Sequence, residues 1–192
     1  MDMRPAHIKW QNLLSSRPMQ GPTHIMAGVI IRRTFGWKSF RGLAVFFTIV
    51  TALLFHGIFD KLAKACYQPP HADFTDPVWL IYHVTVWLTS LVMLYMYWGE
   101  YKVGIIFSLL PDIDWIVIGT ADLFGKQVIF YKEPWIHNAI NYFIDNVIPF
   151  SYLNLLPDNR LNPLAAVWEI LLFALLVLIF RIQTTRRRNI HF

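Results

Sequence analysis

The sequence predicts an all-α fold, a polytopic membrane bundle of about four transmembrane helices with short re-entrant or amphipathic helices beside them. Of its 192 residues, 56% are hydrophobic and only 15% are charged, and the mean hydropathy is +0.42. A soluble domain is typically about 25% charged. The apolar residues form runs of about 20, the length that a helix needs to cross the hydrocarbon core of a bilayer. We therefore expect one membrane domain over residues 22–183, with polar tails at 1–21 and 184–192.

Four segments are long and apolar enough to cross a bilayer, namely residues 43–62, 78–98, 103–121 and 164–183. Tryptophan and tyrosine near the ends of the second segment fit the interface between lipid and water, where amphipathic rings gather. We expect a tight turn at residues 99–102, because only a few residues separate the second segment from the third. The cluster of arginines after the fourth segment marks its end.

Two shorter helices complete the predicted fold. Residues 22–31 form a short apolar run that cannot span about 30 Å of hydrocarbon, so we expect a helix that lies at the membrane or dips into it. Residues 134–147 begin with a proline and mix aromatic with polar side chains. This pattern predicts an amphipathic helix at the membrane surface.

The distribution of basic residues predicts the orientation of the chain. Four spans place both termini on one side, and that side carries 12 of the 17 lysines and arginines when the turn at 99–102 is included. Cytoplasmic segments of membrane proteins are rich in these residues, so we expect both termini to be cytoplasmic. No zinc-finger, RNA-recognition or helix-turn-helix pattern accompanies the basic ends, which argues against a nucleic-acid partner. The single cysteine, Cys66, excludes an intramolecular disulfide and a multi-cysteine metal site.

Ionisable residues inside the predicted spans indicate chemistry, because such a side chain costs at least a few kcal/mol unless it is paired, solvated or bound to metal. His56 and Asp60 are four residues apart, so they share one helical face and can hold one divalent metal ion. The alternative is a neutral structural histidine, with Asp60 at the water interface beside Lys61 and Lys64.

The segment Leu-Leu-Pro-Asp-Ile-Asp at residues 109–114 is a second candidate. Pro111 interrupts the helical hydrogen bonds, and Asp112 can cap the helix that restarts after it. Capping accounts for one aspartate but not for Asp114, so we expect a metal or proton-relay site here. Glu169, in the last span, is expected to be a hydrogen-bond partner between helices.

The predicted topology brings these candidates into one half of the membrane. Five ionisable candidates lie in the middle to outer parts of the first three spans: His56, Asp60, His83, Asp112 and Asp114. His137 falls on the amphipathic helix on the same side, where it shares a face with Asn141 and Asp145. We expect His137 to be a catalytic acid or base, or a further metal ligand.

These residues also carry a family resemblance. Thr23-His24 followed by a helix of small residues, the Leu-Leu-Pro-Asp-Ile-Asp segment and His56-x3-Asp60 resemble the predicted inner-membrane metal-dependent hydrolases, a bacterial family. The resemblance implies a bacterial inner-membrane protein whose metal ligands are His24, His56, Asp60, Asp112 and Asp114. The chain departs from the family pattern at Trp115, where a histidine is usual, in lacking an Arg-Gly-x-Thr-His segment, and in the order of its two aspartate motifs.

The resulting functional hypothesis is a membrane-embedded hydrolase that uses a divalent metal ion, with zinc expected, on an ester or phosphoester. A membrane lipid or a lipid-linked molecule is the expected substrate, because the predicted site adjoins the bilayer. Two alternatives remain open, a non-catalytic integral membrane protein and a small ion or proton carrier. A carrier is expected to show internal repeats, and the sequence has none that we detect.

Overall fold

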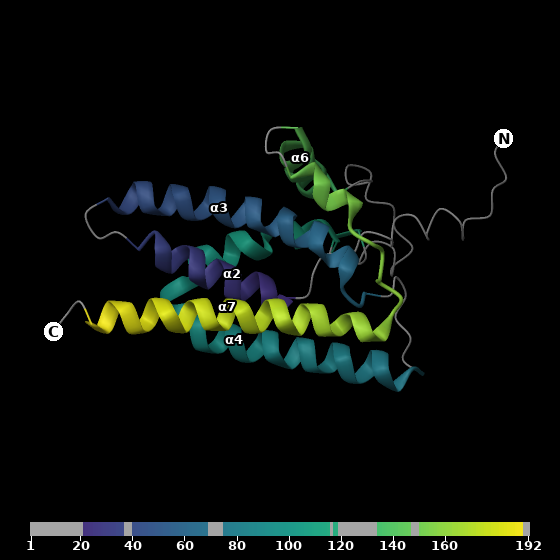
Figure 1. Cartoon of the computed structure of the whole chain (residues 1–192). Coiled ribbons are helices and arrows are strands. Elements are labelled where there is room, and N and C mark those ends of the chain that lie inside the picture. Colours follow the sequence, from purple (N-terminus) through teal and green to yellow (C-terminus); the bar gives the residue numbers. More distant parts are fainter. Residues whose placement is uncertain are drawn as a thin grey trace.

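The computed structural model of the chain describes residues 21–36, 40–68, 75–115, 117–118, 134–146 and 150–189 (Figure 1). Within these residues every regular element is helical. The α-helices are α2 (Gly21–Thr34), α3 (Arg41–Leu62), α4 (Pro77–Leu109), α6 (Trp135–Asn146) and α7 (Ala166–Asn189). Short 3₁₀ helices join them, namely η1 (Ala63–Ala65), η2 (Leu110–Asp112), η3 (Ser151–Leu155) and η4 (Pro163–Ala165). The predicted all-α class is confirmed.

Three helical stretches are long and apolar enough to cross a membrane, over Arg41–Ala65, Pro77–Trp115 and Pro163–Arg186. Large apolar side chains of α3, α4 and α7 are exposed, whereas histidines, threonines and acids lie in the interior. Water-soluble proteins show the opposite arrangement, because burial of apolar side chains drives their folding. Polar side chains thus share the described interior with apolar ones, while large apolar side chains cover the outside, which is compatible with the integral membrane protein that the composition predicted.

The predicted second and third spans belong to one helical run in the structure. Residues 99–102 are helical, so the tight turn expected there is wrong as a local conformation. Asp76 caps the start of α4 by accepting from the main-chain N–H of Val78 at 2.9 Å, and Pro77 follows as the first helical residue. The helix then continues through Gly99 because no proline or capping residue stops it before Pro111.

The contacts of α4 with α2 nevertheless require the chain to change direction. Ser90 lies beside the first residue of α2, and Tyr101 accepts a hydrogen bond from Arg33 near the last turn of α2. Further along α4, Ser108 lies beside Gly28, back toward the middle of α2. Contacts along a straight helix would progress in one direction, so α4 folds back on itself near Tyr101. Figure 1 shows the teal ribbon of α4 returning behind α2.

Helix α2 is the centre of the bundle. Its residues from Pro22 to Val29 are all buried, and it packs against α3, α4 and α7. A short helix is therefore present where it was expected at residues 22–31, but it is enclosed by protein and does not lie at the surface of the bundle. Gly28 and Gly104 allow this, since a Cβ atom on Gly104 would lie 2.0 Å from the carbonyl oxygen of Gly28.

Helix α6 matches the amphipathic helix that was predicted at residues 134–147. His137 and Ile144 are buried on one face, while Trp135 and Tyr142 are exposed on the other. The buried face packs against α3.

Replacement of Gly104 with alanine should destabilise the bundle. The new methyl group would overlap main-chain atoms of Gly28, which cannot rotate away. We expect a cost of about 1–3 kcal/mol, the usual range for overpacking, seen as a lower thermal midpoint of the full chain in detergent. Gly42→Ala is the matched control because nothing lies within 4 Å of its added Cβ. Equal midpoints for the two variants would contradict the close packing of α2 on α4.

Candidate metal centre

Five helical segments bring histidine and aspartate side chains together in the interior. His24 comes from α2, His56 and Asp60 from α3, Asp112 from η2, Asp114 from the helical residues 113–115 that follow η2, and His137 from α6. His24, His56, Asp114 and His137 are buried, and the side chains of Asp60 and Asp112 are only 12% and 21% exposed. The structure therefore unites all six residues that the sequence proposed as ligands or as the catalytic residue.

Three acceptor atoms form a nearly equilateral triangle at the centre of this group. The His56 Nε2 atom lies 3.0 Å from Asp60 Oδ2 and 3.2 Å from His137 Nε2. The third side, from His137 Nε2 to Asp60 Oδ2, is 3.3 Å long. About one helical turn of α3 and one residue of α6 place these atoms, because His56 and Asp60 are four residues apart and share a face of α3.

The second nitrogen of each imidazole fixes which atom carries the proton. His56 Nδ1 lies 2.7 Å from the carbonyl oxygen of Ser108, which can only accept, so Nδ1 donates. His137 Nδ1 lies 3.1 Å from Asp114 Oδ2 and donates to this carboxylate in the same way. In the neutral rings both Nε2 atoms are therefore unprotonated lone pairs that face each other and Asp60. The His137 Nε2 atom also accepts from the indole N–H of Trp115 at 3.1 Å, so a proton or a metal ion shared with His56 and Asp60 would have to replace that hydrogen bond.

His24 and Asp112 complete the group on its other side. The His24 ring stacks on His56 with centroids 4.2 Å apart, and its Nε2 lies 3.4 Å from Asp60 Oδ1. Asp112 Oδ1 lies 3.9 Å from His56 Nε2. Neither ring nitrogen of His24 nor Oδ1 of Asp112 has a hydrogen-bond partner within the described part of the chain. Buried polar atoms are rarely left in this state, so a ligand is the physical expectation.

Two groups of side chains are close enough to share one ion: His24, His56 and Asp60 form the first, and His56, Asp112 and His137 form the second. Asp114 belongs to neither group and lies behind His137. Its Oδ2 accepts from both the main-chain N–H of His137, at 2.9 Å, and the ring. Carboxylates that hold a ligating histidine in this way fix its tautomer and orientation. The geometry gives Asp114 this positioning role, whereas the sequence suggested a direct ligand.

Two contributors were not identified from the sequence. The indole Nε1 of Trp115 donates to His137 Nε2 at 3.1 Å, and the main-chain carbonyl of Ser108 orients His56. No side-chain pattern could have revealed a carbonyl acceptor. Trp115 was noted only as a departure from the family motif, although its position next to Asp114 was a usable signal.

Two buried ionisable residues lie apart from the cluster. His83 stacks on Trp79 and bonds to the carbonyl oxygen of Trp79 at 2.8 Å, so it does not join the converging set as predicted. Glu169 accepts from Tyr82 and, at 3.4 Å, from Thr23. These partners lie on α4 and α2, which confirms Glu169 as a hydrogen-bond partner between helices.

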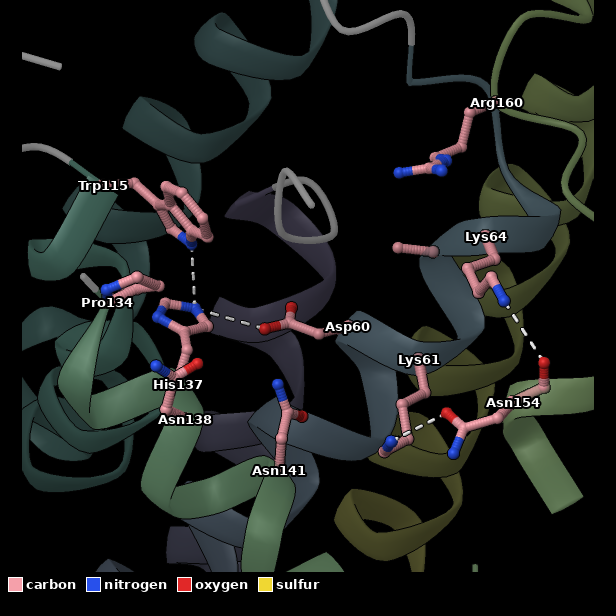
Figure 2. A pocket seen from close by; sticks show the side chains of 11 residues that line it. Asp60, Lys61, Lys64, Trp115, Pro134, His137, Asn138, Asn141, Asn154 and Arg160 are labelled. Carbon is pink, nitrogen blue, oxygen red and sulfur yellow. Dashed lines mark hydrogen bonds and ion pairs between the residues drawn. The ribbon is translucent and has the colours of Figure 1, made fainter. Parts of the chain in front are cut away.

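A cavity of about 300 Å³ adjoins the cluster (Figure 2). Asp60, Trp115 and His137 line one side of it, and Lys64 and Arg160 line the other. Asn141 also lines the cavity, whereas Asp145, on the same predicted face of α6, binds Lys61. The cavity thus joins the histidine and aspartate cluster to the end of the bundle at which α3 stops.

No protein-family model, curated protein or solved structure matches this chain. The site therefore has to be interpreted from its own geometry. It defines a helical protein of the membrane-spanning type whose interior holds groups of histidine and aspartate that could bind a metal ion.

A clamp between α3 and α6 holds His137 in place and should make stability depend on pH. Lys61 donates to Asp145 at 2.8 Å, and this hydrogen bond lowers the pKa of Asp145 below its usual 3.8. A lowered pKa in the folded state stabilises the fold above pH 3.8, and the contribution is lost as the pH falls through the lowered value.

Asp145→Asn should therefore lower the thermal midpoint in detergent at neutral pH. The difference from the natural chain should shrink as the pH is brought below 3.8. A difference that stays constant from neutral to acidic pH would show that the Lys61–Asp145 pair does not contribute this stability.

Proposed function

We propose that this chain is a membrane-embedded hydrolase that binds one divalent metal ion, with zinc expected, and cleaves an ester or phosphoester. The observation that carries the proposal is the triangle of His56 Nε2, His137 Nε2 and Asp60 Oδ2, whose sides are 3.0, 3.2 and 3.3 Å. Zinc binds nitrogen and oxygen ligands at about 2.0–2.1 Å, so neighbouring ligand atoms of a tetrahedral site are about 3.3 Å apart. The observed spacings match that value.

One ion accounts better for the cluster than two. The two possible ligand groups share His56, and only its Nε2 is available because Nδ1 is bound to the Ser108 carbonyl. We assign the ion to His56, Asp60 and His137, a set that takes ligands from both groups and whose atoms lie 3.0–3.3 Å apart. The ion would replace the hydrogen bond from Trp115 to His137. His24 would be the fourth protein ligand, or its side of the ion would be left to the substrate. His137 was predicted to be a catalytic acid or base, or a further metal ligand, and the proposal uses it as a ligand that Asp114 orients.

The reaction needs an activated water molecule. A divalent ion held by His56, Asp60 and His137 would lower the pKa of a bound water toward 7 and would polarise the bond to be cleaved. The water oxygen then bonds to the acyl carbon or phosphorus, the bond to the leaving oxygen breaks, and the leaving oxygen takes up a proton. Asp112, whose Oδ1 has no hydrogen-bond partner among the described residues, is placed to accept the proton of the water.

The resemblance to inner-membrane metal-dependent hydrolases is part of this proposal. The structure supports it through the burial of His24, which the resemblance required and which composition did not suggest. Under this proposal the protein resides in a bacterial inner membrane, and its substrate is a lipid or a lipid-linked molecule.

Metal analysis tests the proposal directly. The purified full chain should bind about one zinc ion, and His56→Ala and Asp60→Asn should abolish tight binding. Asp114→Asn should weaken binding by about 10–100-fold, the usual effect of losing a partner of a ligating histidine. His83→Ala is the matched control, because His83 is equally a buried histidine of a spanning helix but lies outside the cluster.

The same proteins should then be assayed on nitrophenyl esters and nitrophenyl phosphates. Hydrolysis should be lost on treatment with a chelator, restored by zinc and absent in Asp60→Asn. If His56→Ala leaves zinc binding unchanged, the proposed metal site is excluded. If the zinc-loaded protein hydrolyses neither the esters nor the phosphates, the proposed hydrolase activity is excluded.

We further propose the orientation in which the basic end of the bundle faces the cytoplasm. The bundle end opposite the site carries Arg32, Arg33, Arg41, Lys102, Arg181 and Arg186, and the described basic residues at the site end are Lys61, Lys64 and Arg160. This bias follows the positive-inside rule. Because α4 folds back, both of its ends lie at the site end, so α4 would supply two of four crossings. The side of residues 1–20, which lie outside the described residues, stays a prediction from the sequence.

Reporter fusions after Lys102 and Phe192 should read cytoplasmic, and a fusion after Lys126 should read external. An external signal at Phe192 would contradict the orientation. A cytoplasmic signal after Lys126 would instead contradict the second crossing of α4.

A further inference from the structure

The cavity beside the metal centre has a charged wall whose purpose the hydrolase proposal does not explain. Its volume of about 300 Å³ is at the lower end for small-molecule sites, so it can take a polar head group but not a whole lipid. Among the described residues, three cationic side chains line it, those of Lys61, Lys64 and Arg160, and Asp60 is the one carboxylate.

The three cations differ in how far they are neutralised. Lys61 is paired with Asp145 at 2.8 Å, and Arg160 is paired with Asp158. Lys64 donates to a neutral group, the main-chain carbonyl of Asn154, at 3.2 Å. Positive charge therefore remains in the lining of the cavity. Figure 2 shows the Arg160 guanidinium extending toward the middle of the view, whereas the Lys64 ammonium turns to the carbonyl oxygen of Asn154 and would have to swing round to reach a ligand.

The wall is also held rigidly. The main-chain N–H of Asn159 donates to the Lys64 carbonyl at 2.8 Å, and that of Gln68 donates to the Arg160 carbonyl at 2.9 Å. Asp158 binds Nε and Nη2 of Arg160, which orients the guanidinium and leaves other N–H groups of its five donors for a ligand. A binding site needs such fixed donors, because ordering flexible side chains would reduce affinity.

The combination of a metal-ligand cluster and a cationic wall within one small cavity selects the substrate. A carboxylic ester is neutral and has no charge for Lys64 and Arg160 to bind. A phosphate group carries negative charge and several acceptor oxygens, which match ammonium and guanidinium donors. Asn138 and Asn141, which also line the cavity, offer further amide donors.

We propose that this cavity binds the phosphate group of the substrate, with Lys64 and Arg160 holding it opposite His56, Asp60 and His137. This inference rests on the proposed function and narrows it to phosphoester hydrolysis. The oxygen of water forms a bond to phosphorus, the phosphorus–oxygen bond to the alcohol breaks, and the alcohol leaves with a proton while the phosphate keeps its negative charge.

Binding of inorganic phosphate tests the inference separately from catalysis. The zinc-loaded full chain, freed of excess zinc, is titrated calorimetrically with phosphate. Lys64→Gln and Arg160→Gln should each weaken phosphate binding by about tenfold or more, the effect of losing a charge-assisted hydrogen bond. Both variants should keep the zinc affinity of the natural chain, since neither residue lies in the metal-binding groups.

Lys102→Gln is the control, because it removes the same charge from an exposed position on α4 outside the cavity. Phosphate affinity that is equal in the natural chain, Lys64→Gln and Arg160→Gln would overturn the inference while zinc binding kept the proposed function intact. A loss in Lys102→Gln as large as in Lys64→Gln would overturn it too, since the effect would then be one of net charge. If the natural chain itself does not bind zinc, the proposed function would be excluded instead.

The source of the phosphate is resolved by reconstitution in nanodiscs. Discs of phosphatidylcholine with and without phosphatidic acid are titrated with inorganic phosphate. Weaker phosphate binding in discs with phosphatidic acid, lost in Lys64→Gln, assigns the cavity to a lipid head group. Equal binding in both discs assigns it to a soluble phosphoester. A competing effect of phosphatidic acid that survives in Lys64→Gln and Arg160→Gln would place the lipid elsewhere and contradict the lipid assignment.

Discussion

The rest of this structure depends on the contacts between the Asp60 carboxylate and the histidines around it. Histidines from three helices approach it, His24 at 3.4 Å, His56 at 3.0 Å and His137 at 3.3 Å. In a surrounding of low dielectric constant an isolated carboxylate is far more costly than in water. The three helices therefore have to meet wherever Asp60 lies, or the charge has to be removed. A shared cation would satisfy all of these groups at once.

This constraint explains why α2 lies at the centre of the bundle. His24 can reach Asp60 only from a helix that packs inside α3 and α4, and the close approach at Gly28 and Gly104 makes room for it. The apolar surfaces of the outer helices remain exposed because lipid, unlike water, does not oppose them. Polar contacts in the interior thus determine how the helices pack against one another, while the exposed hydrophobic residues determine that the bundle forms in lipid.

The site and its cavity differ in how they are built. The cluster uses residues of α2, α3 and α6 and of the helical segment that follows α4. The opposite wall of the cavity uses the end of α3 and the segment around Arg160, which main-chain hydrogen bonds join. Rigid placement of both walls is what a reacting group requires, because small displacements from productive geometry lower rates strongly.

The sequence by itself determined the membrane class, the first and last spanning helices, the amphipathic α6 and the pairing of His56 with Asp60. These properties follow from local composition and helical periodicity. Only the tertiary structure decided that residues 99–102 stay helical, that Asp114 orients His137, that His83 lies apart, and that Lys64 and Arg160 line the same cavity as Asp60. Each of these depends on which distant segments pack together, and a single chain's periodicity describes each helix face without identifying its neighbour. The direction of an imidazole proton is decided in the same way, by the carbonyl or carboxylate that another helix brings to it.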